Sequence, residues 1–322
     1  MLGSSQAAGT LLAVKARLSV WGLGITLRRL LGVRLGRLHQ YLPRSLSVDH
    51  IKAEAGDDDL PSIALVTPSF NQARFVGETI RSVVGQAYPN LEYVVQDACS
   101  TDGTVDILRT FVGKGVDIRI EPDGGQADAL NLGFSRTSGE VMGYLNSDDL
   151  LLPGTLQFVG RFFRDNPSVD VIYGNRLIID ENGLEIGRWI LPGHDPQLLR
   201  FVDYVPQETM FWRRRIWDRV GGRIDAYLHF VLDWDLILRF VGAGAVFRHV
   251  PGLFGVFRVH GRQKSQADFV VCGAKEMAGL QRRNSGLDLS RFDRLAHHWR
   301  YLLDLRRADA AFETGLLDKD CL

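Results

Sequence analysis

The stretch VMGYLNSDDLLLPG, residues 141–154, joins a short apolar run to two adjacent carboxylates and a proline. Its first five residues have the length and composition of a buried strand, and Asp148 and Asp149 follow where that strand ends. Adjacent carboxylates repel each other unless a cation or hydrogen bonds hold them, and hard divalent cations prefer oxygen ligands. We therefore interpret this pair as a divalent-metal site. The alternative is a solvated acidic turn before Pro153.

Predicted strands and helices alternate on the N-terminal side of this stretch. Apolar runs predict strands, and apolar residues at helical spacing predict helices, at residues 62–67, 74–86, 91–96, 102–112, 116–120 and 126–134 in turn. Such alternation indicates βαβ units, in which ligands bind at the carboxyl ends of the strands. The predicted fold class is α/β, with a mostly parallel central sheet flanked by helices.

Beyond Pro153 the pattern is less regular. Strands are predicted at 169–173, 177–179, 184–189, 246–249 and 254–259, and helices through three phenylalanines near 160 and at 233–240. The Asn-Gly turn within 181–183 predicts a hairpin. We expect three parts: a basic amphipathic N-terminal extension (1–56), an α/β domain (57–265) and a helical C-terminal extension (266–322).

The composition is that of an ordinary globular protein, with 322 residues, 45% hydrophobic and 24% charged, and zero formal net charge. A neutral chain gives no electrostatic reason to expect nucleic acid as a partner. Three widely spaced cysteines argue against a disulfide framework and favour a reducing compartment. No apolar run reaches about 18 residues, so no transmembrane helix is predicted and we expect a cytoplasmic protein.

The first 48 residues contain seven Lys and Arg residues and no Asp or Glu. Apolar side chains and Trp21 lie between the basic ones, and arginines interrupt the apolar run, which excludes a secretory signal. A basic amphipathic segment suits an anionic membrane surface, here the inner face of the plasma membrane. Two alternatives stay open: a helix packed on the domain, or a basic tail. Six glycines weaken any helix in this segment.

Polar clusters also follow the other predicted strands. Phe70 offers a ring on which a base can stack, and Asp97 ends its strand where a carboxylate can accept a hydrogen bond from a base. Capping of the next helix is the better explanation of Thr101 and Asp102. The sequence DGGQADALN, residues 123–131, places glycines before a helix N-terminus, which favours phosphate. A strand-ending turn at Phe70 and a plain glycine turn at 123–131 remain as alternatives.

Two further clusters lie in the second half. Asp233 and Asp235 begin a predicted helix two residues apart, so they point in different directions. One can cap the helix while the other faces a cleft as a general base, or both can complement the helix dipole. Arg258 and His260 share one face at the end of a strand. Contact with a diphosphate or metal and a purely structural role are equally open for them.

Taken in order, these motifs resemble the family 2 glycosyltransferases with the GT-A fold. The resemblance covers residues 62–262 and rests on TPSFN, QDACSTDGT, PDGGQADALNLGF, GYLNSDDLLLPG, LDWDLILR and FRVHGRQKS. It implies a GT-A type nucleotide-diphospho-sugar transferase fold. It also implies transfer of a sugar, from a UDP-sugar by expectation, to a glycan or lipid-linked acceptor in polysaccharide or cell-surface glycan biosynthesis.

The resemblance implies a role for each matching position. The nucleotide-sugar donor is expected to contact Thr67, Phe70, Asn71, Asp97, Gln126, Asn131, Asp148 and Arg258. Asp148 and Asp149 correspond to the metal site for Mn²⁺ or Mg²⁺, and His260 to a further metal or diphosphate contact. Asp233 stands where the family keeps its catalytic base.

Three positions depart from the family pattern. Asn146 stands where the family often has Asp, which leaves the metal to the two carboxylates that follow. Leu232 replaces a frequent Glu before the base, so the choice between Asp233 and Asp235 stays open. Cys99 replaces the usual glycine after the second strand.

The mechanism implied is a single displacement with inversion at the anomeric carbon, in which Asp233 takes the proton of the acceptor hydroxyl. Two other classes remain as alternatives: a sugar nucleotidyltransferase and a non-catalytic nucleotide-sugar binding module. The former needs a Gly-rich start with Arg and Lys for a triphosphate, where this chain has TPSFN. The latter does not need three pocket carboxylates together.

Overall fold

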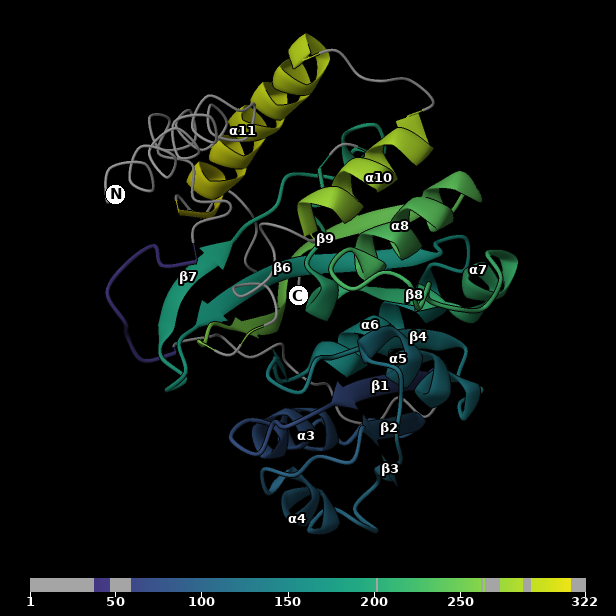
Figure 1. Cartoon of the computed structure of the whole chain (residues 1–322). Coiled ribbons are helices and arrows are strands. Elements are labelled where there is room, and N and C mark those ends of the chain that lie inside the picture. The colour runs from purple at the N-terminus through teal and green to yellow at the C-terminus, as the bar shows by residue number, and fades with distance from the viewer. Residues whose placement is uncertain are drawn as a thin grey trace, which may run out of the picture.

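The computed structural model describes residues 38–46, 59–200, 202–261, 263, 273–285 and 291–313. Most of the predicted basic extension (1–56) lies outside the described residues, and none of the described helices is long and apolar enough to cross a membrane. Figure 1 shows the arrangement of the elements.

The first half of the fold alternates strands and helices as predicted. Its elements are β1 (Ile63–Ser69), α3 (Val76–Val84), β2 (Leu91–Asp97), α4 (Thr104–Arg109), β3 (Asp117–Ile120), α5 (Gln126–Ser135) and β4 (Val141–Tyr144). The second half contains β5 (Leu150–Leu151), α6 (Thr155–Asp165), β6 (Val171–Ile179), β7 (Glu185–Trp189), the short 3-10 turns η1 (Leu198–Arg200) and η2 (Gln207–Thr209), β8 (Phe211–Arg213), α7 (Arg214–Arg219), α8 (Leu232–Gly242), β9 (Phe247–Arg258), α10 (Ala274–Ser285) and α11 (Arg291–Glu313).

The described strands form one mixed sheet in the order β3-β2-β1-β4-β8-β6-β9-β5, with β7 paired to β6. β1 to β4 pair in parallel, and so do β6 and β9. Antiparallel pairs join β8 to β4, β5 to β9 and β7 to β6. Because the longest pairings are the parallel ones, the predicted α/β class with a mostly parallel sheet is confirmed.

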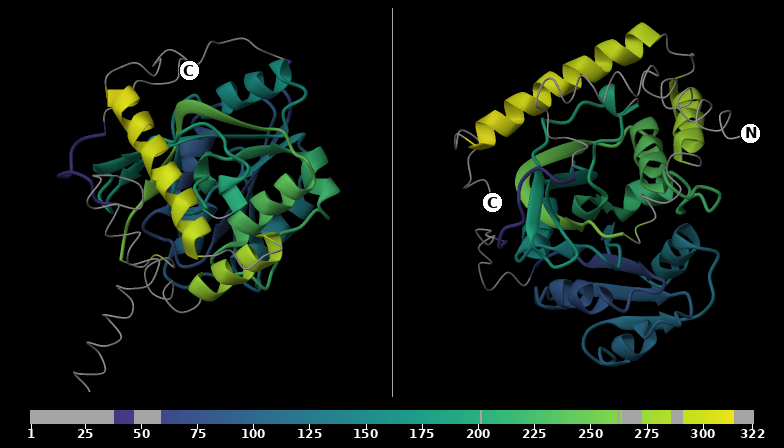
Figure 2. Two further views of the ribbon diagram at one scale, coloured as in Figure 1. Left: turned by 90° about the horizontal axis from the view of Figure 1, so that it is seen from above. Right: turned by 60° about the vertical axis from the view of Figure 1, so that its left-hand side comes forward.

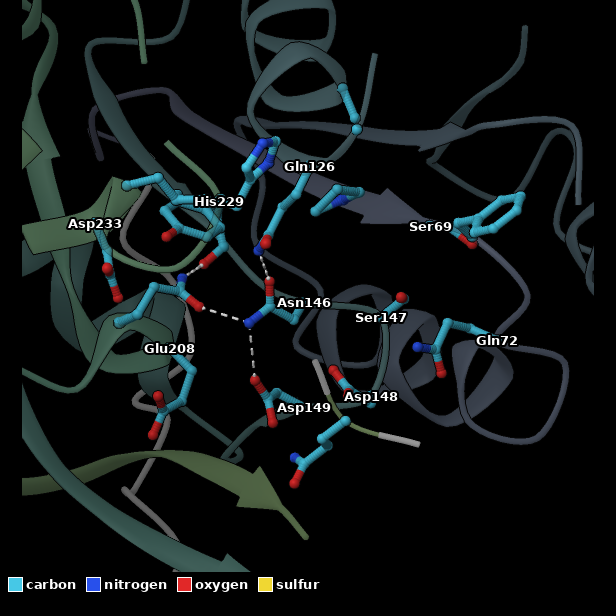
Figure 3. Close-up of a pocket in the computed structure, with 18 of the residues that line it drawn as sticks. Ser69, Gln72, Gln126, Asn146, Ser147, Asp148, Asp149, Glu208, His229 and Asp233 are labelled. Carbon is cyan, nitrogen blue, oxygen red and sulfur yellow. Dashed lines mark hydrogen bonds between the residues drawn. The ribbon is translucent and has the colours of Figure 1, made fainter. Parts of the chain in front are cut away.

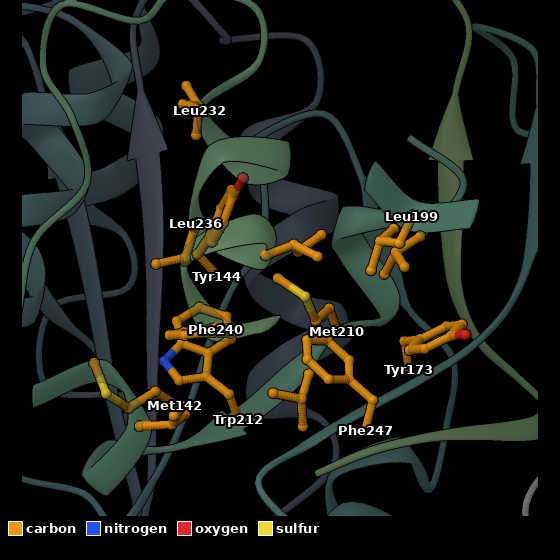
Figure 4. Close-up of a cluster of buried hydrophobic side chains, with 14 of the residues drawn as sticks. Met142, Tyr144, Tyr173, Leu199, Met210, Trp212, Leu232, Leu236, Phe240 and Phe247 are labelled. Carbon is orange, nitrogen blue, oxygen red and sulfur yellow. The ribbon is translucent and has the colours of Figure 1, made fainter. Parts of the chain in front are cut away.

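Side chains of β1 point alternately to the two faces of the sheet, and each face is covered by its own helices. Ala64 and Val66 face a core shared with α5 and α8, whereas Ile63 and Leu65 face a core shared with α3, α4 and α6. Figure 4 shows the first core around Trp212. α5 lies so close to β1 that a Cβ at residue 133, a glycine, would overlap Val66.

Two pairs of predicted strands are in fact single strands. The strands predicted at 169–173 and 177–179 fall mostly within β6, and those at 246–249 and 254–259 mostly within β9. The two strands pair with each other through the gaps between the predicted ranges, with shifts of register. The hairpin at the Asn-Gly turn is confirmed by the antiparallel pairing of β6 and β7.

The described chain ends pack on the second half of the fold. Residues 38–46 run beside β7, where Arg44 pairs with the buried Glu185 at 2.8 Å. α10 and α11 lie on the side of the molecule away from β3 and α4 (Figures 1 and 2). Tyr301 and Leu305 of α11 are buried in the α5–α8 core, so this helix is part of the packed structure.

Candidate active site

A pocket of about 680 Å³ opens at the carboxyl ends of β1, β2 and β4, the edge of the sheet that the topology predicts for a ligand. The starts of α5 and α8 and the turn η2 close its other sides. Figure 3 shows its lining, and the predicted site residues that reach it are Phe70, Gln126, Asp148, Asp149 and Asp233. The sheet therefore brings together residues from four separate motifs.

The end of β9, the antiparallel partner of β5, holds the carboxylate pair that follows β4. Asp149 is 1% exposed; its Oδ1 accepts the backbone N–H of Arg258 at 3.0 Å, and its Oδ2 accepts Asn146 Nδ2 at 3.3 Å. Asp148 Oδ2 lies 2.9 Å from Nε2 of His260. The end of β9 and the segment just after it thus fix the direction of both carboxylates.

The electrostatics of this pair suit a bound cation. Burial, followed by the charges of Asp148 and Glu208, raises the pKa of Asp149 well above its usual range. Within the described residues no group of three or more His, Cys, Asp or Glu side chains forms a metal cluster. Two carboxylates at a pocket wall fit a divalent ion whose other ligands are substrate phosphates and water. The donor set therefore fits Mn²⁺ or Mg²⁺.

Arg258 and His260 lie behind the carboxylate pair, outside the pocket lining. Arg258 Nε donates to the carbonyl of Asp148 at 3.0 Å, and its guanidinium pairs with Glu78 at 2.6 Å. The His260 ring lies 4.7 Å from that of Phe75. These contacts orient the loop that carries the pair.

At the end of β1, Phe70 is 60% exposed and lines the pocket. Thr67 and Asn71 lie outside the lining. Thr67 is buried in the sheet, 3.0 Å from the hydroxyl of Tyr93, and the Asn71 side chain accepts the backbone N–H of Thr101 at 3.0 Å. The motif TPSFN therefore presents its aromatic ring to the pocket and anchors the neighbouring loop with its asparagine.

Asp97, at the end of β2, is fully buried and accepts three hydrogen bonds. Its donors are the hydroxyl of Ser69 at 2.8 Å, and the backbone N–H and hydroxyl of Ser100 at 2.8 and 2.7 Å. The prediction that Thr101 or Asp102 caps the next helix is wrong in position: Gly103 is the N-cap residue, and Asp102, one residue before it, accepts the N–H of Thr104 at 3.1 Å.

The two predicted contacts on α5 are placed differently. Gln126, the first residue of the helix, lines the pocket and donates from Nε2 to Oδ1 of Asn146 at 2.8 Å. Asn131 lies one turn further on and exchanges hydrogen bonds with the backbone of Ile224, at 2.8 and 3.0 Å. Gly125, with φ of 112°, gives the turn that leads into the helix.

The first turn of α8 separates the two candidate bases. Asp233 lines the pocket, and its carboxylate accepts the N–H of Trp234 at 2.8 Å. Asp235 is buried on the other side of the helix, 2.8 Å from Arg239 and 3.4 Å from Arg283 of α10. Burial raises the pKa of Asp233 despite the backbone hydrogen bond. Only Asp233 faces the pocket.

Several pocket residues carried no motif in the sequence. Asn146 Nδ2 donates to Oε1 of Gln207 at 3.0 Å, and Gln207 Nε2 donates to the carbonyl of Tyr144. Glu208 and Arg176 also line the pocket, 2.9 Å apart. The one signal for Gln207 and Glu208 is a short polar interruption, residues 207–209, in a mostly apolar stretch; Arg176 stands within an apolar strand and carries no such signal.

With this geometry in view, the chain can be compared with known proteins. The model of the family described as glycosyl transferase family 2 matches residues 64–224, half of the chain. The chain belongs to this family. That range contains β1 to β4 and both carboxylates at the end of β4, and it ends before α8.

Solved structures confirm the GT-A fold. TarS of S. aureus (residues 1–349), in complex with UDP-GlcNAc, has a TM-score of 0.58 and 17% identity, covering 79% of this chain and 75% of that one. The mannosyltransferase PcManGT of Pyrobaculum calidifontis, in complex with GDP-Man and Mn²⁺, has a TM-score of 0.55 and 18% identity, covering 95% and 86%.

Sequence relatives are biosynthetic proteins. The chain is 31% identical over 195 residues to the O-antigen biosynthesis protein RfbC of Myxococcus xanthus, covering 59% of this chain and 15% of that protein. It is 30% identical over 148 residues to the putative teichuronic acid biosynthesis glycosyltransferase TuaG of Bacillus subtilis (strain 168), covering 44% and 56%. The matched part thus spans less than two thirds of either relative.

Proposed function

We propose that this chain is an inverting glycosyltransferase that moves a sugar from a nucleotide-diphosphate sugar to a glycan or lipid-linked acceptor. One observation carries the proposal: Asp233 faces the same pocket as Asp148 and Asp149. Transfer needs a base near the acceptor and a cation near the leaving diphosphate, and a binding module needs neither.

The pocket divides between the two ends of the donor. Phe70, exposed at the end of β1, stacks on the base, and Gln126 at the N-terminus of α5 contacts the diphosphate or sugar. Asp97 is fully buried and lies outside the lining, so it supports the base or ribose contact by holding Ser69 and Ser100 beside the Phe70 loop. UDP is the expected nucleotide, and TarS in complex with UDP-GlcNAc supports this choice.

Asp148 and Asp149 would hold Mn²⁺ or Mg²⁺ at the diphosphate. PcManGT in complex with GDP-Man and Mn²⁺ supports a metal, and so does the raised pKa of Asp149, because a buried carboxylate beside two others favours a cation nearby. When bound, such a cation neutralises charge on the leaving diphosphate.

The protein residues then carry a single displacement. The acceptor oxygen attacks the anomeric carbon, the bond from that carbon to the diphosphate oxygen breaks, and Asp233 takes the proton of the acceptor hydroxyl. A raised pKa suits this role, because a base works best when its pKa approaches the working pH. Asp235, engaged with Arg239 and Arg283, holds the helix that presents Asp233.

The relatives in O-antigen and teichuronic acid biosynthesis support a place in cell-surface polysaccharide assembly. A test begins with a thermal-shift screen of UDP-glucose, UDP-N-acetylglucosamine and GDP-mannose, since a ligand at a hundred times its Kd stabilises a fold by about 2.7 kcal/mol. Release of nucleoside diphosphate is then measured with and without Mn²⁺. Metal-dependent release is expected. Binding without release would favour the binding module, and pyrophosphate made from a sugar phosphate and a nucleoside triphosphate would favour the nucleotidyltransferase.

We also propose that the basic segment before residue 48 contacts anionic lipid at the inner face of the plasma membrane. The support is its sequence alone: seven basic residues among apolar ones and no acidic residue. Deleting residues 10–40 should release the protein from anionic vesicles while turnover in solution persists, and salt should weaken binding of the full chain. Equal pelleting of the full-length and truncated chains would contradict the proposal.

A further inference from the structure

One carboxylate of the pocket is buried beside an arginine but has no aligned hydrogen-bond donor among the described residues. Glu208 is 2% exposed and lines the pocket, and both its carboxylate oxygens lack a hydrogen-bond partner among the described residues. Leaving a buried charged acceptor unbonded costs more than almost any other polar defect. A group that the protein keeps in this state is available to a ligand.

Glu208 is held in place by close packing and by one cation. A Cβ at residue 255, a glycine of β9, would lie 2.7 Å from its Cγ, so the strand and the side chain are in contact. Arg176 Nε lies 2.9 Å from Oε1, without the alignment of a hydrogen bond. The Arg176 guanidinium is itself 4.2 Å from the ring of Trp189 and 4.8 Å from that of Phe257. The carboxylate is therefore pre-oriented.

The position of Glu208 identifies the part of the substrate that it meets. Figure 3 shows Glu208 on the side of the pocket where Asp149 and Asp233 lie. All three side chains line the same pocket. In the proposed reaction Asp149 lies at the diphosphate and Asp233 at the acceptor oxygen, and the transferred sugar must lie between them. A residue close to both borders that sugar.

We propose that Glu208 binds hydroxyl groups of the transferred sugar and that the site selects a neutral sugar over a uronic acid. This inference rests on the proposed transferase function. Sugar hydroxyls are donors that a carboxylate without an aligned hydrogen-bond donor of its own can accept, and such a site rejects an analogue lacking the donor. A second metal ion is disfavoured, because the Arg176 guanidinium already lies 2.9 Å away.

The selection against uronic acids follows from the charges around the sugar. With the charges of Asp148 and Asp149 offset by the proposed cation, Glu208 and Asp233 remain as acidic groups beside the sugar, and Arg176 in the same lining is already engaged by Glu208. A sugar carboxylate placed there meets like charges in a partly desolvated site, which costs binding free energy. A neutral ring brings only hydroxyl donors.

The test measures affinities of the full chain for UDP, UDP-glucose, UDP-N-acetylglucosamine, GDP-mannose and UDP-glucuronic acid by calorimetry. Monodeoxy analogues of the tightest neutral binder follow, each lacking one hydroxyl. At least one analogue should bind wild type roughly ten- to a hundredfold more weakly, and the same analogue should show a clearly smaller penalty in Glu208→Gln, because the amide offers one neutral acceptor oxygen in place of a charged carboxylate. UDP itself should bind both proteins equally.

Glu181→Gln is the matched control, because Glu181 also pairs with an arginine, Arg74, but on the exposed surface. It should keep the full deoxy penalty. Three results would each overturn the proposal: no penalty for any analogue in wild type, an equal penalty in Glu208→Gln, or tightest binding of UDP-glucuronic acid. The wild-type series alone decides if the variant misfolds. If no nucleotide or nucleotide sugar binds, the transferase function itself fails and this inference falls with it.

Discussion

Asp97 ends β2 and Asp149 follows β4, and both of these strands pair in parallel with β1. Both carboxylates are buried, yet their surroundings differ. Asp97 receives three hydrogen bonds at 2.7–2.8 Å from Ser69 and Ser100 in its own corner of the fold. Asp149 receives one backbone bond at 3.0 Å and a longer one from Asn146, and it faces two further carboxylates.

This difference shows two ways in which a carboxylate can be buried at the end of a strand. Hydrogen bonds to the charged form stabilise a buried carboxylate, whereas burial beside like charges destabilises it. The end of β2 is complete without a ligand, whereas the end of β4, in the proposed function, takes up a cation. The same reasoning separates Asp235, paired with Arg239, from Asp233, which faces the pocket.

The largest effect is expected at the end of β4. Asp149→Ala should abolish transfer at any Mn²⁺ concentration and remove the rise in melting temperature that Mn²⁺ with UDP gives wild type, because the cation loses a ligand. Asp106→Ala, on the exposed surface of α4, is the control and should keep both. Full activity of Asp149→Ala in Mn²⁺ would show that the metal assignment is wrong.

The next effect separates the two acids of α8. Asp233→Asn keeps the shape but removes the proton acceptor, so turnover at saturating donor should fall by a factor of about 100 to 10,000 while donor binding persists. Asp235→Asn should lower the melting temperature and leave most turnover, because it weakens the contacts with Arg239 and Arg283. An inactive, stable Asp235→Asn beside an active Asp233→Asn would reverse the assignment.

A smaller effect tests whether Asp97, at the end of β2, serves the fold alone or also holds the nucleotide. Asp97→Ala should destabilise the fold by about 1–3 kcal/mol, because Ser69 and Ser100 lose their acceptor. Asp97→Asn should recover most of this stability, since both hydroxyls can turn to accept from the amide. It should still bind UDP less tightly, by roughly tenfold, if Asp97 also holds the nucleotide. Equal UDP affinity would limit Asp97 to a role in the loop.

The sequence predicted best what depends on neighbouring residues along the chain. Strand–helix alternation predicted the parallel half of the sheet, and therefore the edge at which Phe70 and Asp149 meet. It could not predict that residues far apart would pair across β6 and β9, since the irregular register there leaves no period to recognise.

The candidate site shows the same limit. The helix pattern predicts that Asp233 and Asp235 begin a helix, and only the family resemblance favours Asp233 as the base. Glu208 and Arg176 were missed because a 3-10 turn of three residues has no periodicity, and their role comes from a contact between β6 and η2. Asn131 carried a motif but bonds to the backbone of Ile224. A pattern of residues identifies the strand end, but only tertiary contacts decide which side chains reach the pocket.

The smallest predicted effect is a shift in pH dependence that follows from Asp233. Burial raises its pKa, so the rate of transfer should rise with pH through a value above the usual 3.8 of an aspartate, because only the ionised carboxylate accepts the proton. Because the folded state holds this proton more tightly than the unfolded state, the free energy of unfolding falls as pH rises through the same range. Asp233→Asn should remove the acid limb of the rate profile and reduce that fall in stability, whereas Asp235→Asn should keep both. A wild-type rate that is flat down to about pH 4 would mean that Asp233 is ionised as readily as a surface aspartate. The difference between hydrogen-bonded carboxylates such as Asp97 and pocket carboxylates would then hold for Asp149 but not for Asp233.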